Sequence, residues 1–267
     1  MEKISNSVYA QIGTRGCNHS FVATSEGPVM IDTPMVYDDA QKWKAEMAKF
    51  GTLRYIINGE PHADHVSGNF FFEAPIIAHE GTRKLILESK PEQYAESLKQ
   101  FDPKGTIPAG YYYRPPVITL SERLTLYVGN HTFQLIHTPG HTPFQISVYV
   151  PEEKVVFTSD NVTYGVPPFL HQAVPFDWIE SLKRLKKLDV EKIVPGHGKV
   201  CSRDHLDTMI GILQGAIDVV KTAIKKGMTL EEAQKNLNLF ESFPRNERMV
   251  MIQNIGMARL YELLKNS

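Results

Sequence analysis

Short apolar runs rich in β-branched and aromatic residues recur along the first two hundred residues, and each run ends in polar residues. Runs of this length and composition predict buried strands. The ends of these runs release histidine and aspartate side chains into the loops that follow. The five clearest examples lie in residues 27–34, 52–65, 132–142, 154–161 and 191–199.

Helical patterns, in which apolar residues recur near every 3.6 positions, separate these strands. They cover residues 38–50, 80–101 and 177–188. Strands that alternate with helices indicate a layered α/β fold. We therefore predict one α/β catalytic domain over residues 1–204.

Beyond residue 204 the pattern is helical only. Thr229 precedes one of these helical segments, and Glu232 lies three residues later, which is the spacing of a capping box. We predict that residues 205–267 form a C-terminal helical extension packed on the α/β domain. The three helical segments are residues 204–227, 229–237 and 248–266.

The last helical segment carries a broad apolar stripe, which must pack against another surface. One hypothesis is that the stripe covers the α/β layer of its own subunit. The other is that it forms part of a homodimer contact together with a tyrosine-rich loop. The stripe contains Met249, Met251, Ile252, Ile255, Met257, Leu260, Tyr261, Leu263 and Leu264.

Composition limits the classes of partner. The formal net charge is −1 and the Lys and Arg residues are scattered, so nothing favours nucleic acid or an anionic membrane as a partner. The chain has only two cysteines, no apolar run near the ~20 residues that span a bilayer, and no signal-peptide pattern at its start. We expect a cytoplasmic protein that acts on a small molecule.

The stretch "INGEPHADHVSGN" (residues 57–69) places His62, Asp64 and His65 within four positions. Alone, it fits a metal site or an ordinary polar turn equally well. Further imidazoles and a carboxylate follow other predicted strands, at His141, Asp160 and His197. His141 and His197 lie beside Gly and Pro residues, and Asp160 lies at the end of a predicted strand. Neutral imidazole combined with carboxylate is the ligand set of a catalytic Zn, Fe or Mn site, whereas a structural zinc site favours thiolates.

These ordered motifs resemble the metallo-β-lactamase superfamily of metal-dependent hydrolases. The family pattern is H-x-H-x-D-H, then a lone His, a bridging Asp and a final His, and the likeness covers roughly residues 8–205. Asp32 also matches the family's strand end. The resemblance implies a four-layer αββα sandwich with metals at one edge, between two sheets. The matching positions are Glu60, His62, Asp64, His65, His141, Asp160 and His197.

The resemblance further assigns the ligands of one or two metal ions, with zinc as the expected metal. It implies that His62 and His141 bind the first metal. It implies that the second metal is bound by Asp64, His65 and His197, and that Asp160 bridges both.

Glu60 stands where the family pattern has its first histidine. A carboxylate keeps a ligand atom but adds negative charge and a harder donor, which favours Mn or Fe over Zn. Three hypotheses remain open at this point, and we favour the first. Glu60 binds the first metal, or the first metal has been lost, or Glu60 acts as a general base beside the bound water.

Two loops are candidates for substrate binding. Residues 102–117 are rich in Pro, Gly and Tyr, and residues 161–173 follow Asp160 directly. Their aromatic residues could wall the site, with Arg114 meeting a substrate carboxylate, or they could simply pack on neighbouring loops. The substrate-binding candidates are Tyr111, Tyr112, Tyr113, Arg114, Tyr164 and Phe169. We expect His79, His137 and His171 to be surface or hydrogen-bonded residues.

The resemblance implies a hydrolase in which a metal-activated hydroxide cleaves an ester, lactone, thioester or amide bond, β-lactams included. Asp64 would orient the nucleophile and accept its proton. Two alternatives use the same fold. One is an iron-dependent redox enzyme, disfavoured because only helical sequence follows residue 204. The other is a phosphodiesterase or nuclease, disfavoured by the lack of a basic stripe.

Overall fold

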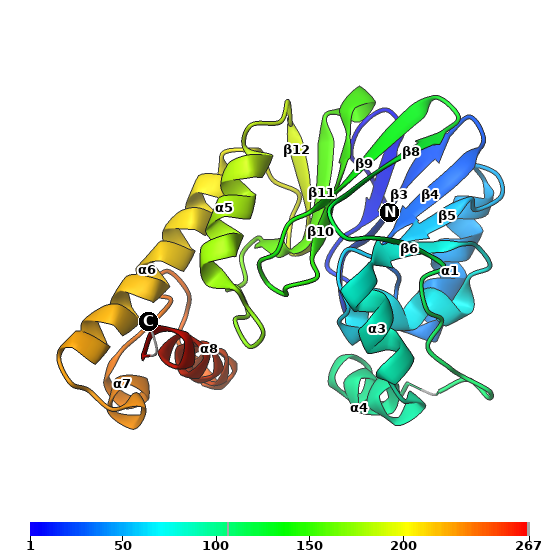
Figure 1. Ribbon diagram of the computed structural model, residues 1–267. Helices are drawn as coiled ribbons and strands as arrows, with labels where there is room; N and C mark the ends of the chain where they lie inside the picture. Colours follow the sequence, from blue (N-terminus) through cyan, green and yellow to red (C-terminus); the bar gives the residue numbers. More distant parts are fainter. Residues whose placement is uncertain (106, 266–267) are drawn as a thin grey trace.

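The computed structural model describes residues 1–105 and 107–265. Two β-sheets pack against each other, and helices cover the outer face of each (Figure 1). This is the αββα sandwich that the sequence predicts. Residue 106, inside the predicted loop 102–117, and residues 266–267, at the end of the predicted extension, lie outside the described residues.

The first sheet has seven strands, arranged in the order of the sequence. Strands β1 to β4 pair antiparallel, and β4 to β7 pair in parallel. Parallel neighbours need a crossover, which α1 (Tyr37–Ala48) provides between β4 and β5. The strands are β1 (Glu2–Lys3), β2 (Val8–Gln11), β3 (His19–Thr24), β4 (Gly27–Ile31), β5 (Tyr55–Ile57), β6 (Ile76–His79) and β7 (Ile118–Leu120).

The second sheet has five strands in the order β12-β11-β10-β9-β8. Among its described strands, β11 and β12 alone pair in parallel, and α5 (Pro175–Leu185) connects them. Buried and more exposed residues alternate along β8 and β9, as expected for strands with one face on the core. The strands are β8 (Arg123–Val128), β9 (His131–His137), β10 (Ile146–Val150), β11 (Val155–Thr163) and β12 (Lys192–His197).

Three clusters of buried apolar side chains hold the four layers together. Ile57 and Phe133 belong to the cluster between the two sheets. Trp43 on α1 lies in the cluster outside the first sheet. Trp178 on α5 lies in the cluster outside the second sheet, which continues into the C-terminal helices. Burying one large apolar side chain contributes about 1.5–3 kcal/mol, so these clusters fix both sheets in place.

The helices between the strands follow the predicted segments with one correction. The pattern over residues 80–101 predicts a continuous helical segment, but the chain forms α3 (Glu80–Glu88) and α4 (Pro91–Phe101). Pro91 explains the break, because proline lacks the amide hydrogen that a helix interior requires and is tolerated in the first turn. A short helix, α2 (Ala63–Val66), continues into the 3-10 helix η1 (Ser67–Phe71), and a second 3-10 turn, η2 (Pro151–Glu153), joins β10 to β11.

The C-terminal region contains α6 (His205–Lys225), α7 (Leu230–Asn236) and α8 (Glu247–Lys265). The capping box between Thr229 and Glu232 forms as predicted. Met249, Met257 and Leu260 of α8 are buried in the cluster that also holds α5 and α6. Much of the apolar stripe is therefore covered within its own subunit, and the homodimer stays a prediction. None of the described helices combines the length and apolar character needed to cross a membrane.

Candidate metal centre

The first sheet supplies four of the predicted ligands from one short segment. The chain leaves β5 at Ile57, and Glu60 and His62 follow in the loop before α2. Asp64 and His65 lie on α2 itself. His62 keeps an extended backbone as the residue before the helix, so the chain turns sharply between the two histidines. Glu60 and His65 are fully buried.

The second sheet supplies the other three. His141 lies in the loop between β9 and β10, Asp160 lies within β11, and His197 is the last residue of β12. The register between β11 and β12 shifts on either side of Ser159. Such an irregularity re-aims a side chain, and here Asp160 turns its carboxylate toward the histidines of both sheets.

Two histidines and two carboxylates meet at the predicted second metal position. His65 Nε2 lies 3.3 Å from Asp160 Oδ1 and 3.8 Å from Asp64 Oδ2. His197 Nε2 lies 3.3 Å from Asp64 Oδ2 and 3.4 Å from Asp160 Oδ2. Asp64, His65 and His197 each place a potential ligand atom within 4.8 Å of the others. The structure thus brings together the side chains predicted for this position.

The predicted first metal position joins His62, His141 and one oxygen of Glu60. His62 Nδ1 lies 3.1 Å from His141 Nε2 and 2.6 Å from Glu60 Oε2. His141 Nε2 lies 3.6 Å from Asp160 Oδ2. The other oxygen of Glu60, Oε1, lies 3.0 Å from His65 Nε2. Glu60 therefore reaches both positions and does not simply occupy the place of one imidazole.

Asp32 holds the His65 ring at Nδ1, the ring nitrogen that faces away from the predicted metal positions. Its Oδ2 lies 2.9 Å from His65 Nδ1 and accepts a hydrogen bond from Ser159 Oγ at 2.6 Å, while its Oδ1 accepts one from the Gly59 amide at 2.8 Å. Asp32 and Ser159 both adopt positive φ, at 55° and 42°. Such strained non-glycine backbone persists where the surroundings hold it, and it concentrates at functional sites.

Two glycines are required by close approach. A Cβ added to Gly59 would lie 1.8 Å from Ser159 Oγ, and one added to Gly196 would lie 1.9 Å from Asp160 Oδ1. Both distances are far below contact, so a larger residue would displace the side chains that shape the site. The Gly residues of "NGEPH" and "VPGHG" thus have a packing reason in addition to their turn propensity.

The charges within the cluster shift the pKa values of its histidines. Burial lowers the pKa of His62, but the carboxylates of Glu60, Asp64 and Asp160 together outweigh burial and raise it to about 9. Burial likewise opposes a charged His197, whose pKa is nevertheless raised to about 10 by Asp160 and Asp64. His141 lies farther from Glu60, so burial dominates and lowers its pKa.

The carboxylates respond in the opposite direction. Burial favours their neutral forms, but His65 and His62 hold the pKa of Glu60 below its usual range. His197 and His65 do the same for Asp160, and His65 does so for Asp64. Ionised carboxylates therefore face imidazole nitrogens across a buried space, and the negative charge that raises the pKa values of His62 and His197 is charge that a bound divalent cation would balance instead of a proton.

Unsatisfied atoms test whether a metal fits. Both carboxylate oxygens of Glu60, Nε2 of His65 and Oδ1 of Asp160 are buried, and although they lie 2.6–3.3 Å from imidazole nitrogens or carboxylate oxygens, none of them makes a hydrogen bond of acceptable geometry among the described residues. Buried polar groups are normally hydrogen-bonded, and exceptions call for an explanation such as an ion. These atoms face one another and are imidazole and carboxylate donors, so the residues fit a first-row transition metal.

Comparison with known proteins identifies the family. A model described as the metallo-beta-lactamase superfamily matches residues 12–197. The chain belongs to this superfamily. A superfamily protein from Thermus thermophilus has a TM-score of 0.72 and 19% identity, over 98% of this chain and 95% of that one. A sec-alkylsulfatase from Pseudomonas sp. has a TM-score of 0.74 and 14% identity, over 98% and 49%. These likenesses show the fold.

Two curated superfamily relatives illustrate the sequence similarity. The beta-lactamase-like protein 2 homolog of Caenorhabditis elegans is 26% identical over 216 residues, covering 76% of this chain and 65% of that protein. A linear primary-alkylsulfatase of Pseudomonas sp. (strain ATCC 19151) is 20% identical over 259 residues, covering 82% and 49%. The chain thus spans about half to two thirds of the length of the first curated relatives it matches.

Among the predicted substrate-binding residues, those of the tyrosine loop divide into buried and open ones. Tyr111 is buried, stacks on Tyr94 with 4.2 Å between ring centroids, and donates to the Ser67 carbonyl. Tyr113 packs against the same buried cluster, whereas Tyr112 is 54% exposed. The loop therefore combines core packing with an open aromatic ring, and its contact with a substrate stays a prediction.

Arg114, Tyr164 and Phe169 differ in their surroundings. The Arg114 guanidinium donates to three backbone carbonyls, those of residues 69, 72 and 74, and so holds the tyrosine loop onto η1 and the segment that leads into β6. Tyr164 lies beside His205, with ring centroids 4.8 Å apart. The Phe169 carbonyl accepts from His141 Nδ1 at 2.7 Å, which places the second loop directly against the metal centre.

The sequence predictions for this second loop do not include Gln172, and they expect His171 to be a surface or hydrogen-bonded residue, whereas the structure places both beside His62. Gln172 Oε1 lies 3.1 Å from His62 Nε2. His171 lies beside His62, with ring centroids 4.8 Å apart, and burial followed by the nearby His62 and His141 lowers its pKa to about 4. The signal available in the sequence was their place in a Pro-rich loop shortly after Asp160.

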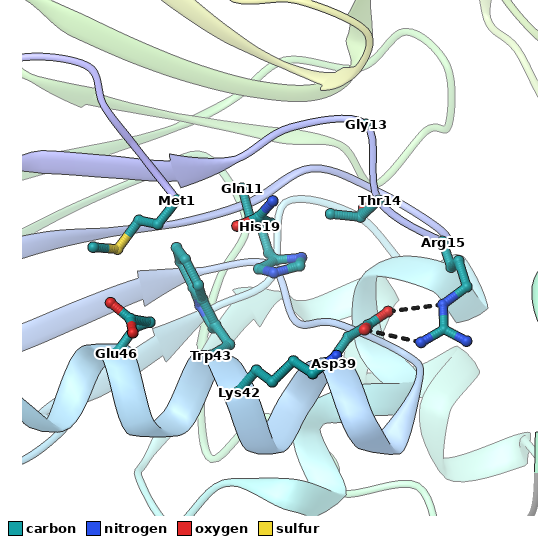
Figure 2. Close-up of a pocket in the computed structure, with 10 residues that line it drawn as sticks. All are labelled: Met1, Gln11, Gly13, Thr14, Arg15, His19, Asp39, Lys42, Trp43 and Glu46. Carbon is teal, nitrogen blue, oxygen red and sulfur yellow. Dashed lines mark hydrogen bonds and ion pairs between the residues drawn. The ribbon is translucent and has the colours of Figure 1, made fainter.

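A cavity of about 610 Å³ lies away from these ligands, between the β2–β3 hairpin and α1 (Figure 2). His19 and Trp43 line its inner part, and Arg15 pairs with Asp39 at its rim. None of the seven predicted ligands lines it. The same hairpin approaches the metal centre at Cys17, whose thiol donates to the Asp64 carbonyl at 3.0 Å.

Proposed function

We propose that this protein is a metal-dependent hydrolase that cleaves an ester, lactone, thioester or amide bond of a small molecule. One observation carries the proposal. Imidazole and carboxylate atoms from both sheets converge in a buried space, and several of them lack a hydrogen-bond partner within the described part of the chain. Membership of the metallo-β-lactamase superfamily supports the same reaction type.

The residues fit one or two ions. Zinc is the expected metal, and the extra carboxylate of Glu60 makes iron or manganese the alternative. His62 and His141 would hold the first ion. Asp64, His65 and His197 would hold the second, and Asp160 would serve both. When bound, such an ion polarises a substrate oxygen and lowers the pKa of water.

The chain's own residues supply orientation and proton transfer. The Asp64 side chain lies at the rim of the buried cluster, between His65 and His197, and is 13% exposed. It can therefore orient a water molecule against an incoming substrate and accept a proton from it. Asp32 keeps Nε2 of His65 directed at the centre by holding Nδ1.

Thioesters and oxygen esters are the first substrates to test. Relatives that match part of this chain are named hydroxyacylglutathione hydrolase, from Bartonella quintana, and acyl-coenzyme A thioesterase, from Gallus gallus. Sulfate esters form a second candidate class, because the linear primary-alkylsulfatase matches over 82% of this chain. The formal net charge of −1 and the scattered basic residues argue against a nuclease.

The test is hydrolysis by the full chain, prepared metal-free and then loaded with Zn, Fe or Mn. The panel contains an acyl-coenzyme A, an acylglutathione, a lactone, a β-lactam and an alkyl sulfate. We expect metal-dependent turnover of at least one acyl substrate, and a loss of about 100-fold or more in kcat for Asp64→Asn. Turnover of the alkyl sulfate alone, or no turnover with any metal, would refute acyl hydrolysis.

A further inference from the structure

Because this chain has Glu60 where the superfamily pattern has its first histidine, the first metal position is one imidazole short of that pattern. Glu60 does not fill that gap alone, because its two oxygens face different histidines, His62 at 2.6 Å and His65 at 3.0 Å. Its carboxylate lies between the two metal positions, as that of Asp160 does. If the first position keeps the number of imidazoles in the superfamily pattern, the missing one comes from elsewhere in the chain.

His171 lies at the required place. His62, His141 and His171 each offer a ring nitrogen, and these three atoms lie within 4.8 Å of one another. The His171 ring centroid lies 4.8 Å from that of His62 and 5.8 Å from that of His141. Its Nδ1 is buried and has no hydrogen-bond partner among residues 1–105 and 107–265.

The surrounding loop is shaped around the same position. The Phe169 carbonyl accepts from His141 Nδ1 at 2.7 Å, and Gln172 Oε1 lies 3.1 Å from His62 Nε2. Both contacts hold the ring nitrogens that face away from the centre, which is how metal-binding histidines are commonly oriented. The Phe169 ring stacks on His171 with 4.4 Å between centroids. Four consecutive residues thus orient two ligands and present a third imidazole.

We propose that His171 completes the first metal position, together with His62 and His141, in place of the imidazole that Glu60 replaced. Glu60 then serves as a second carboxylate between the two positions. The proposal rests on the metal-dependent function proposed above. Packing against Phe169 alone does not account for it, because packing requires no ring nitrogen at His62 and His141 and leaves Nδ1 unsatisfied.

The first experiment measures zinc binding by the full chain in competition with a chromophoric chelator. We expect His171→Ala to weaken one of two zinc ions by about 10-fold or more, since losing even a group that orients a ligand costs about that much. His137→Ala is the matched control, because His137 lies outside the cluster and contacts the Pro143 carbonyl. It should leave both affinities unchanged.

A double variant tests replacement directly. If His171 takes the place of the lost imidazole, Glu60→His combined with His171→Ala should recover at least part of the affinity that His171→Ala loses. Equal affinity of wild type and His171→Ala for both ions would overturn the proposal, as would a double variant no tighter than His171→Ala. Circular dichroism of each variant checks that it is folded.

A structure of the zinc-loaded wild type decides the matter without any variant. Anomalous difference density should place a His171 nitrogen about 2.0–2.1 Å from the ion held by His62 and His141. An ion there without a His171 nitrogen in contact would refute the proposal. Zinc binding needs no substrate, so a wild type that binds zinc at His171 yet hydrolyses nothing would refute the proposed function and leave this proposal standing.

Discussion

Replacing Asp32 with asparagine changes one atom and should reverse the role of His65. The Gly59 amide requires an oxygen on one side of the Asp32 side chain, so the new NH2 group would face His65 Nδ1 and Ser159 Oγ. His65 Nδ1 must then accept a hydrogen bond, and the ring proton moves to Nε2. That atom faces Glu60 and Asp160 and would lose the lone pair that binds a metal.

The magnitude follows from the bond that is lost. A hydrogen bond to a charged group is worth about 1.5–3 kcal/mol. Each 1.4 kcal/mol corresponds to about a tenfold change in affinity. Asp32→Asn should therefore weaken the metal at the second position by about 10- to 100-fold, while the first position, which does not use His65, changes little.

The assay is chelator competition with zinc on the full chain. Asp39→Asn is the matched control, because Asp39 pairs with Arg15 at the surface, away from the predicted ligands. The control should bind both ions as the wild type does. Wild-type affinity at the second position in Asp32→Asn would refute the proposed orientation of His65 by Asp32.

Three further predictions follow from individual contacts. Glu60→His should raise zinc affinity at the first position, as measured by isothermal titration calorimetry, because an imidazole replaces an anion; unchanged affinity would place Glu60 outside the ligand set. Gly59→Ala should lower the free energy of unfolding by more than about 2 kcal/mol in urea denaturation, because its Cβ would collide with Ser159; a smaller loss would show that the loop yields freely. Burial lowers the pKa of His19 from 6.5 to about 4. Between these two pH values the imidazole is protonated in the unfolded state but neutral in the folded state. The free energy of unfolding therefore falls as pH falls through this window. Between pH 7 and pH 5, the free energy of unfolding of His19→Phe, measured by urea denaturation, should therefore fall by about 2 kcal/mol less than that of the wild type. An equal fall in both proteins would contradict a neutral His19 in the folded state.

Much of the fold is predictable from the sequence because its signals are local. The runs ending at Asp32 and His197 have the strand composition that periodicity detects, and β4 and β12 form there. The Thr229 capping box is equally local. The break at Pro91 could have been predicted from the same rules, because proline favours the first turn of a helix.

The candidate site is less predictable, because its parts depend on how separate loops meet. His62 and His141 could be assigned to one metal position only through the family resemblance. For His171 the sequence signal is only its place in a loop shortly after Asp160, and its importance depends on the path of residues 161–173 over His141. Arg114 shows the converse: its charge suggested a substrate contact, and only the fold shows the backbone carbonyls that it binds.

Metal content together with metal dependence tests the account's central claim most directly. Wild-type protein purified without chelators should contain one or two first-row transition metal ions per chain by elemental analysis. Removing the metal should abolish hydrolysis of the best substrate, and restoring zinc, iron or manganese should return it. Metal-free protein that retains full activity would contradict the account.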